Sequence, residues 1–430
     1  MNTDASVATL HDAPGPAAGA ARGHRFDPLD PAHRDDPYPV YARMRANDPA
    51  HLTPDGEPTL YLFRHADNHR WLRDPRLIRE WRTFADPGAT WAPLDPETFE
   101  GVAANWMLLR DPPDHTRLRG LASKAFTPRR VATWQPEIER LAAWLIARAR
   151  DESDGEPVDL IDAYAFPMPV LVIARILGVP DDEYERFRAW ASFIAAALDL
   201  PVAEQASFAA RADDAVAELS EFLRWIIAAR RADPRDDLIS AMLAATDDGA
   251  TLTEDELIAT LILLLVAGHE TTVNLIGNGT RALLTHPKQW AALRDDPGLA
   301  GNATEELLRF DSPVQMTGRL TAEAVEIGGV PVPAGTWVMF VLGSANRDPA
   351  AFTDPERLDV RREVGRIMSF GMGIHFCLGA PLARLEGQVA FATLAREVPD
   401  LALAEERSVW RHGVILRGLA TLPVWLETGH

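Results

Sequence analysis

Cysteine is almost absent from this sequence, since Cys377 is the only one among 430 residues. A single cysteine excludes an intrachain disulfide scaffold and is typical of a reducing, cytoplasmic compartment. Positive charge is also scarce, because 43 basic side chains face 63 acidic ones and give a formal net charge of -20. Non-specific nucleic-acid binding needs a cationic surface, so the charge balance argues against that class of function.

Long apolar runs are absent too. The longest, residues 261–268, is too short to span a bilayer. Residues 1–24 are rich in Ala and Gly and lack the basic start and apolar run of a signal peptide, so we expect a disordered leader there. Neither Gly-x-Gly-x-x-Gly nor His-Glu-x-x-His occurs, which leaves a bound dinucleotide or a zinc site without support. We therefore expect a soluble protein located in the cytoplasm.

Helical periodicity dominates most of the chain. Amphipathic or buried helices are predicted over residues 134–150, 161–177, 182–198, 204–231 and 236–245. A longer helix is predicted from Thr253 to about Thr285, because Thr253 and Glu256 form a capping box at its start. Strand-like segments cover residues 59–63, 324–327, 330–333 and 337–340, with a hairpin-like stretch over 414–426. We expect residues 25–430 to form one mainly α domain with a minor β-rich region.

Cys377 lies in the glycine-rich segment 369–379, directly before a segment with helical character. The positive end of a helix dipole favours the thiolate form of a cysteine at such a position. The flanking glycines allow the backbone to turn sharply and to approach a large, flat partner closely. These residues alone leave three interpretations open: an inert buried thiol, a nucleophile or a metal ligand.

The long predicted helix carries Ala267, Gly268, Glu270 and Thr271 within five residues. Glycine inside a helix costs about 1 kcal/mol relative to alanine, so its presence favours a groove for a small ligand such as dioxygen. A carboxylic acid followed by an alcohol suits proton delivery to oxygen. An ordinary, weakly amphipathic helix turn remains an alternative explanation of the same residues.

Two pairs of charged or polar residues are spaced to share a helix face: Glu306 with Arg309, and His115 with Arg119. Taken alone, such pairs are usually solvated surface contacts that contribute little stability. Their meaning therefore depends on the surrounding pattern.

The pattern Phe370-x-x-Gly373-x-His375-x-Cys377-x-Gly379 resembles the haem-binding loop of the cytochrome P-450 family of haem-thiolate monooxygenases. Other segments match the same family in the expected order, and the resemblance covers roughly residues 26–426. It implies a single, mostly helical domain that holds haem b between the long helix and the helix after Cys377.

The resemblance also implies a role for each matching residue. Cys377 would be the thiolate ligand of the iron, in a loop that includes Phe370 and Gly379. Thr271 would hydrogen-bond dioxygen and Glu270 would relay protons to it, while Ala267 and Gly268 leave room above the iron. The donors to the haem propionates would be His115, Arg119, Arg319 and His375. A buried structural network would comprise Glu306, Arg309 and Arg357.

The activity implied by the resemblance is insertion of one oxygen atom from O2 into a hydrophobic small molecule, by hydroxylation or epoxidation. Electrons would come from a ferredoxin and its NAD(P)H-dependent reductase. The candidates for a basic docking face are Arg117, Lys124, Arg129, Arg130 and Arg384. A peroxide-driven peroxygenase, a non-catalytic haem-binding protein and a haem-free helical protein remain alternatives, although the first two would not need the Glu270–Thr271 pair.

The resemblance places the substrate pocket among apolar side chains. Residues 75–105 form a long irregular stretch rich in proline and tryptophan, which suggests a binding lid. The candidate pocket residues are Trp91, Trp106, Phe193, Ala197, Leu264, Val314, Met316 and Leu416. Because nearly all of them are apolar, we expect a medium-to-large hydrophobic substrate such as a terpenoid, steroid, fatty acid or polyketide.

Overall fold

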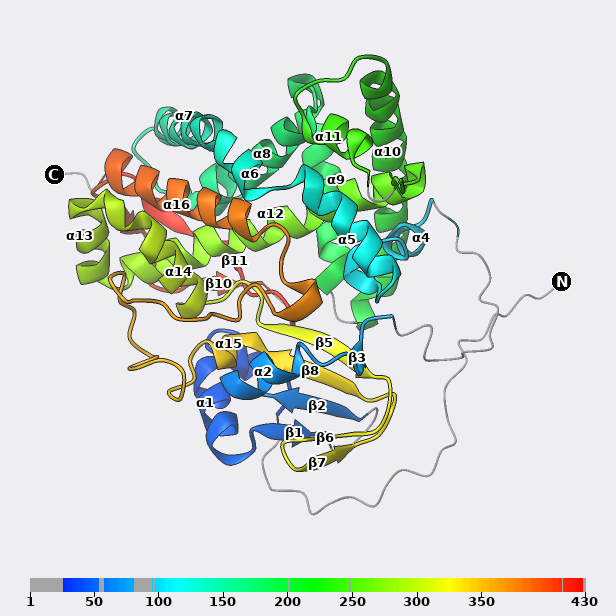
Figure 1. Ribbon diagram of the computed structural model, residues 1–430. Coiled ribbons are helices and arrows are strands. Elements are labelled where there is room, and N and C mark those ends of the chain that lie inside the picture. The colour runs from blue at the N-terminus through cyan, green and yellow to red at the C-terminus, as the bar shows by residue number, and fades with distance from the viewer. Residues whose placement is uncertain are drawn as a thin grey trace.

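The computed structural model describes residues 26–53, 58–80, 95, 97–199, 202–246, 249–411 and 413–427. The protein is mainly α with a smaller β region, as predicted. Figure 1 shows the larger helices gathered in the upper part, with a five-stranded sheet and the short helices α1, α2 and α15 below them. The predicted leader, residues 1–24, lies outside the described residues.

Fifteen α-helices account for most of the described chain. They are α1 (Tyr38–Asn47), α2 (His65–Trp71), α4 (Phe99–Ala103), α5 (Asp114–Ala125), α6 (Pro128–Thr133), α7 (Gln135–Ser153), α8 (Pro167–Leu177), α9 (Tyr184–Asp199), α10 (Val202–Ala232), α11 (Leu238–Ala244), α12 (Glu254–Leu284), α13 (Pro287–Asp295), α14 (Ala300–Phe310), α15 (Leu342–Ala345) and α16 (Ala380–Glu397). The predicted helices match α7 to α12 within a few residues at each end.

Helix α12 crosses the middle of the helical part and packs against α8, α9, α14 and α16 (Figure 1). It begins with the predicted capping box. The Thr253 hydroxyl accepts from the Glu256 N–H at 3.2 Å, and the Glu256 carboxylate accepts from the Thr253 N–H at 2.9 Å. By length and composition α12 is apolar enough to cross a membrane. Its apolar side chains are buried against the neighbouring helices, as in the core helix of a globular domain.

The main sheet has the strand order β1-β2-β8-β5-β3. Its strands are β1 (Ala50–Leu52), β2 (Thr59–Leu62), β8 (Trp337–Val341), β5 (Met316–Thr321) and β3 (Leu77–Ile78), with only β2 and β8 parallel among them. A separate hairpin pairs β6 (Val325–Ile327) with β7 (Val330–Val332). Because Ile78 faces Leu320 across β3 and β5, Arg79 comes next to Arg319, and this register matters for the site.

Two predicted elements differ in the structure. The helix predicted over 161–177 begins with a π-helical turn at Ile161–Ala165, and regular α-helix starts only at Pro167. The hairpin predicted over 414–426 is wrong, because its two strands pair elsewhere. β11 (Leu419–Thr421) pairs with β10 (Val409–Trp410), whereas β12 (Pro423–Trp425) lies between β4 (Val158–Asp159) and β9 (Ala402–Leu403).

Candidate functional site

The loop before α16 holds Cys377 in a fixed position. The Cys377 N–H donates to the Phe370 carbonyl at 2.9 Å, and Gly379 caps α16 two residues later. Gly373 has a φ of 74°, and a Cβ there would lie 2.7 Å from the Leu72 carbonyl oxygen. Only glycine fits that position, so the glycine-rich spacing has a steric cause.

Burial raises the pKa of the Cys377 thiol, and this effect opposes the helix dipole. Backbone N–H groups of Gly379 and Ala380 and the charge of Arg119 act in the other direction, because each favours the thiolate. A bound metal cation would add a much stronger stabilisation of the thiolate. The thiol environment therefore suits a metal ligand better than a free nucleophile.

A cavity of about 270 Å³ separates this loop from α12. Cys377, Phe370 and Gly379 line one side of the cavity, and Ala267, Gly268 and Thr271 line the other. Beyond the backbone of α12 itself, no atom of the described residues lies within 4 Å of the Cβ that a side chain at 268 would carry, so the glycine keeps this side open. The structure thus brings the two segments that the sequence singled out to face each other.

The acid and the alcohol of α12 are oriented differently. Thr271 donates its hydroxyl proton to the Ala267 carbonyl at 2.8 Å and borders the cavity. Glu270 is not among the described residues that line the cavity, and its carboxylate is ion-paired with Arg411 from the C-terminal region. His269 is fully buried with its ring edge-on to Phe166 at 4.5 Å between ring centroids, and burial lowers its pKa to about 3.

The four predicted carboxylate donors meet at one edge of the cavity. The rings of His115 and His375 lie 4.3 Å apart between centroids. Within the described part of the chain, neither nitrogen of His115 nor the Nε2 of His375 has a hydrogen-bond partner, although all three are buried. Arg119 donates to the Phe376 carbonyl at 2.6 Å, and Arg319 donates to the Gly318 carbonyl at 2.7 Å. Buried donors without partners are costly, so this edge is built for a ligand with acceptors.

Arg79 joins these donors and was missed from the sequence. It lines the same cavity and donates to the carbonyls of Leu108 and Gly318 at 3.1 and 3.0 Å. Burial lowers the pKa of Arg79 to about 10 and that of Arg319 to about 9. Lowered values mean that the positive charges lack sufficient counter-charge. No local pattern marks Arg79, because only the β3–β5 register brings it beside Arg319.

A second missed residue is Glu386, on α16. Its side chain lines the cavity and is buried, and its Oε2 has no hydrogen-bond partner among the described residues. Burial raises the pKa of Glu386 to about 8, so the carboxyl is mainly neutral at pH 7. It follows Cys377 by nine residues. This spacing alone does not predict a cavity residue, because the cavity forms only when α16 packs against α12.

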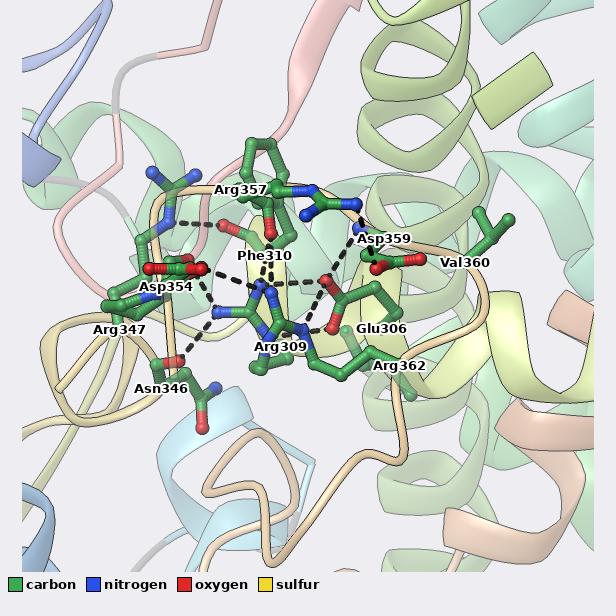
Figure 2. A network of polar contacts seen from close by, with 12 residues as sticks. Glu306, Arg309, Phe310, Asn346, Arg347, Asp354, Arg357, Asp359, Val360 and Arg362 are labelled. Carbon is green, nitrogen blue, oxygen red and sulfur yellow. Dashed lines mark hydrogen bonds and ion pairs between the residues drawn. The ribbon is translucent and has the colours of Figure 1, made fainter. Parts of the chain in front are cut away.

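The predicted structural network is present, with one correction (Figure 2). Glu306 and Arg309 are fully buried and joined by two bonds of 2.7 and 2.9 Å. The second guanidinium on Glu306 belongs to Arg362, at 3.0 Å. Arg357 was the wrong prediction, because its side chain is 65% exposed and only its backbone carbonyl accepts from Arg309. The loop after Asp354 turns the Arg357 side chain toward Asp359 and solvent.

The structure places only some of the residues predicted for the substrate pocket at this cavity. Leu264 and Val314 line the cavity, together with Met107, Leu108, Pro169, Ile173 and Leu263, which the sequence did not single out. Trp106 is instead fully buried and packs edge-on against Phe99, and Phe193 is 38% exposed on α9. Met316 and Leu416 line a different cavity. Trp91, together with the rest of residues 81–94 of the predicted lid, lies outside the described residues, as does the side chain of Ala197.

The predicted basic docking face carries less free charge than expected. Arg117 is paired with Glu256, Arg130 with Asp236 and Arg384 with Glu305. Lys124 donates to the Thr246 carbonyl at 2.5 Å. Three of the five cations are therefore neutralised locally by carboxylates.

The residues present fit an iron porphyrin with two carboxylates. A partly buried thiol faces an open helix groove across the cavity, and buried donors without partners lie at one edge. These features define a haem-thiolate site. The thiol would ligate the iron, and His115, Arg119, Arg319, His375 and Arg79 would hold the propionates.

Comparisons with known proteins agree. Residues 96–296 and 299–397 match the family model described as Cytochrome P450. The chain is 45% identical over 396 residues to the vitamin D(3) 25-hydroxylase of Pseudonocardia autotrophica, covering 90% of this chain and 93% of that one. It is 42% identical over 400 residues to the cytochrome P450 monooxygenase PikC of Streptomyces venezuelae, covering 92% of each.

A solved structure gives the same result for the fold. The cytochrome P450 PksS of the Bacillus subtilis 168 bacillaene polyketide synthase is 37% identical and superposes with a TM-score of 0.85, over 94% of this chain and 100% of that one. The chain belongs to the cytochrome P450 family. It is a monooxygenase of the haem-thiolate type, and its cofactor is haem b.

Proposed function

We propose that this monooxygenase hydroxylates or epoxidises a medium-to-large hydrophobic molecule, with electrons from a ferredoxin and its NAD(P)H-dependent reductase. The observation that carries the proposal is the lining of the cavity. Apart from the donors at one edge, most of the residues that line the cavity are apolar, and they include Leu263, Leu264, Ile173 and Val314. Such a surface binds apolar molecules by desolvation and offers few polar groups to a charged substrate.

The names of the relatives support a large substrate. One is a vitamin D(3) hydroxylase, and another belongs to a polyketide synthase system. Both names refer to large, mostly apolar carbon skeletons, which agrees with the apolar lining here. A terpenoid, steroid, fatty acid or polyketide is the substrate class that we infer.

The reaction takes up one O2, two electrons and two protons, and releases the oxygenated product and water. Haem b, when bound, would supply the iron at which dioxygen is reduced, and the Cys377 thiolate would donate electron density that favours O–O cleavage. Thr271 can turn its hydroxyl from the Ala267 carbonyl toward the cavity and donate a hydrogen bond to the reacting oxygen. Glu270, the preceding residue, supplies protons to that hydroxyl. We also infer a cytoplasmic location, which fits the single cysteine.

Substrate class is tested by the spectral shift that follows displacement of water from the haem iron. Vitamin D3, a macrolactone, a long-chain fatty acid and small charged compounds are titrated in parallel. We expect saturating shifts with the large apolar probes, and Leu264→Phe should weaken them. Phe193→Ala is the matched control, because Phe193 does not line the cavity. Strong responses only to small charged compounds would overturn the proposal.

The electron source is tested by comparing two assays. We expect turnover with NADPH, reductase and ferredoxin, with a reduction rate that falls as salt rises because charged surfaces meet. Efficient turnover with peroxide alone and none with ferredoxin would instead show a peroxygenase. The thiolate assignment is tested separately, since the reduced, CO-treated protein should show a red-shifted Soret band that Cys377→Ser abolishes.

A further inference from the structure

Among the described residues, Glu270 lines neither of two cavities, but it is adjacent to one residue of each. On one side, the adjacent Thr271 borders the catalytic cavity. On the other, the guanidinium of Arg411 binds the Glu270 carboxylate, and Arg411 lines a second cavity of about 160 Å³. The Glu270 side chain is only 12% exposed, so its position is set by these contacts and not by solvent.

The second cavity reaches the surface. It lies between residues 26–41 and the C-terminal segment that includes Arg411, Val414 and Arg417. Leu29, at its rim, is 57% exposed, and the Arg411 side chain is 35% exposed. Asp30, His33 and Arg34 give its wall polar character, which suits water.

The backbone near Arg411 is held by several contacts, one of which comes from α12. The Arg411 N–H donates to the Gly418 carbonyl at 3.0 Å, and Asn278 of α12 donates to the Arg417 carbonyl at 2.9 Å. The Arg417 guanidinium bonds Asp311 at 2.8 Å and stacks on Trp410, with 3.5 Å from its carbon to the ring centroid. The backbone from which the Arg411 side chain extends to Glu270 is therefore well fixed.

We propose that Arg411 is a positioning residue for Glu270, and that the second cavity is the route by which water supplies protons to it. The ion pair holds the carboxylate in one orientation, next to Thr271 along the chain and against a guanidinium that lines the second cavity. Without Arg411 the carboxylate would sample several rotamers, and productive proton transfer would become less frequent. The inference rests on the proposed proton-relay role of Glu270.

The test compares Arg411→Gln, Glu270→Gln and the double variant as haem-loaded proteins. Arg407→Gln is the matched control, because Arg407 is exposed in the same C-terminal region. The first readouts are the solvent deuterium isotope effect on product formation and the fraction of NADPH that ends in product. We expect Arg411→Gln to lower that fraction at least threefold and to raise the isotope effect, in the same direction as Glu270→Gln. Arg411→Lys should restore part of both.

Epistasis distinguishes positioning from general damage. If Arg411 acts through Glu270, then adding Arg411→Gln to Glu270→Gln should change neither readout further. The same cycle on Tm should be non-additive, and this second readout does not depend on activity. Fully additive effects, or a normal isotope effect in Arg411→Gln beside an altered one in Glu270→Gln, would overturn the role of Arg411 alone. A normal isotope effect in Glu270→Gln itself would instead overturn the proposed relay.

Discussion

Two groups of charged or polar residues in this protein differ in whether their hydrogen bonds are complete. In the network on α14, all five N–H groups of Arg309 have acceptors, and Glu306 accepts four hydrogen bonds (Figure 2). At the edge of the catalytic cavity, the ring nitrogens of His115 have no partner among the described residues. The first group is complete as protein alone, whereas the second needs a ligand.

The difference indicates that the buried charges have a structural role on α14 and a ligand-binding role at the cavity. A complete buried network fixes the chain path between α14 and residues 346–362, and removing one member leaves an uncompensated charge. Buried donors without partners destabilise the haem-free protein, and binding of an anionic ligand removes this cost. We therefore expect substitutions in the α14 network to act with and without haem, and substitutions of the cavity donors to act only when haem is bound.

The largest effect is expected for Glu306→Gln. The change keeps the shape but removes the negative charge between two buried guanidinium groups, so unfolding should become easier by about 3–5 kcal/mol. Thermal denaturation should show a much lower Tm, or too little folded protein to measure, with and without haem. An unchanged Tm would mean that the backbone carbonyls around Arg309 are sufficient partners.

Arg79→Gln and Arg319→Gln are expected to act only through haem. Each removes a charge-assisted bond to a propionate, worth about 1.5–3 kcal/mol, so haem transfer to apomyoglobin should become roughly 10- to 100-fold faster. The Tm of the haem-free protein should stay the same or rise, because a poorly compensated charge is lost. Arg76→Gln is the control, since that exposed residue three positions away pairs with Asp74 on the surface. Equal losses of Tm in haem-free and haem-loaded protein would contradict this assignment.

Glu386→Gln should change the pH dependence of stability. The unfolded carboxyl has a pKa of 4.5, and burial raises it to about 8 in the folded protein. Between these values the folded protein holds a proton that the unfolded chain has lost, so wild-type stability falls as pH rises from about 4.5 to 8. Glutamine cannot ionise, so the variant should gain roughly 3–4 kcal/mol over wild type at pH 8.5 relative to pH 5, at about 1.4 kcal/mol for each pKa unit. A Tm difference that does not vary with pH would contradict the raised pKa.

The same contrast explains which parts of the site could be predicted from sequence. Cys377, Gly373 and the Thr253–Glu256 cap depend on local backbone geometry, so their spacing carries the information. Arg79 and Glu386 depend on which strands and helices become neighbours, and nothing within a few residues of either encodes that. Met316 and Leu416 were placed in the wrong cavity for a related reason. A β-bridge pairs Val314, which lines the catalytic cavity, with Leu416, which lines the second cavity, and no local sequence pattern predicts this pairing.

The smallest effect, and the sharpest check on the corrected network, is expected for Arg357→Gln. Its exposed side chain forms only a surface pair with Asp359 at 3.3 Å, and its contribution to the network is a backbone carbonyl that the substitution keeps. The change in stability should stay within about 0.5 kcal/mol. Arg362→Gln, five residues later, removes a side chain that is 14% exposed and bonds Glu306, so it should lower Tm clearly. If Arg357→Gln proved the more damaging of the two in parallel thermal denaturation, the buried partner of Glu306 would have to be reassigned. Retention of haem by both variants would show that this network acts on the chain path and not on the cofactor.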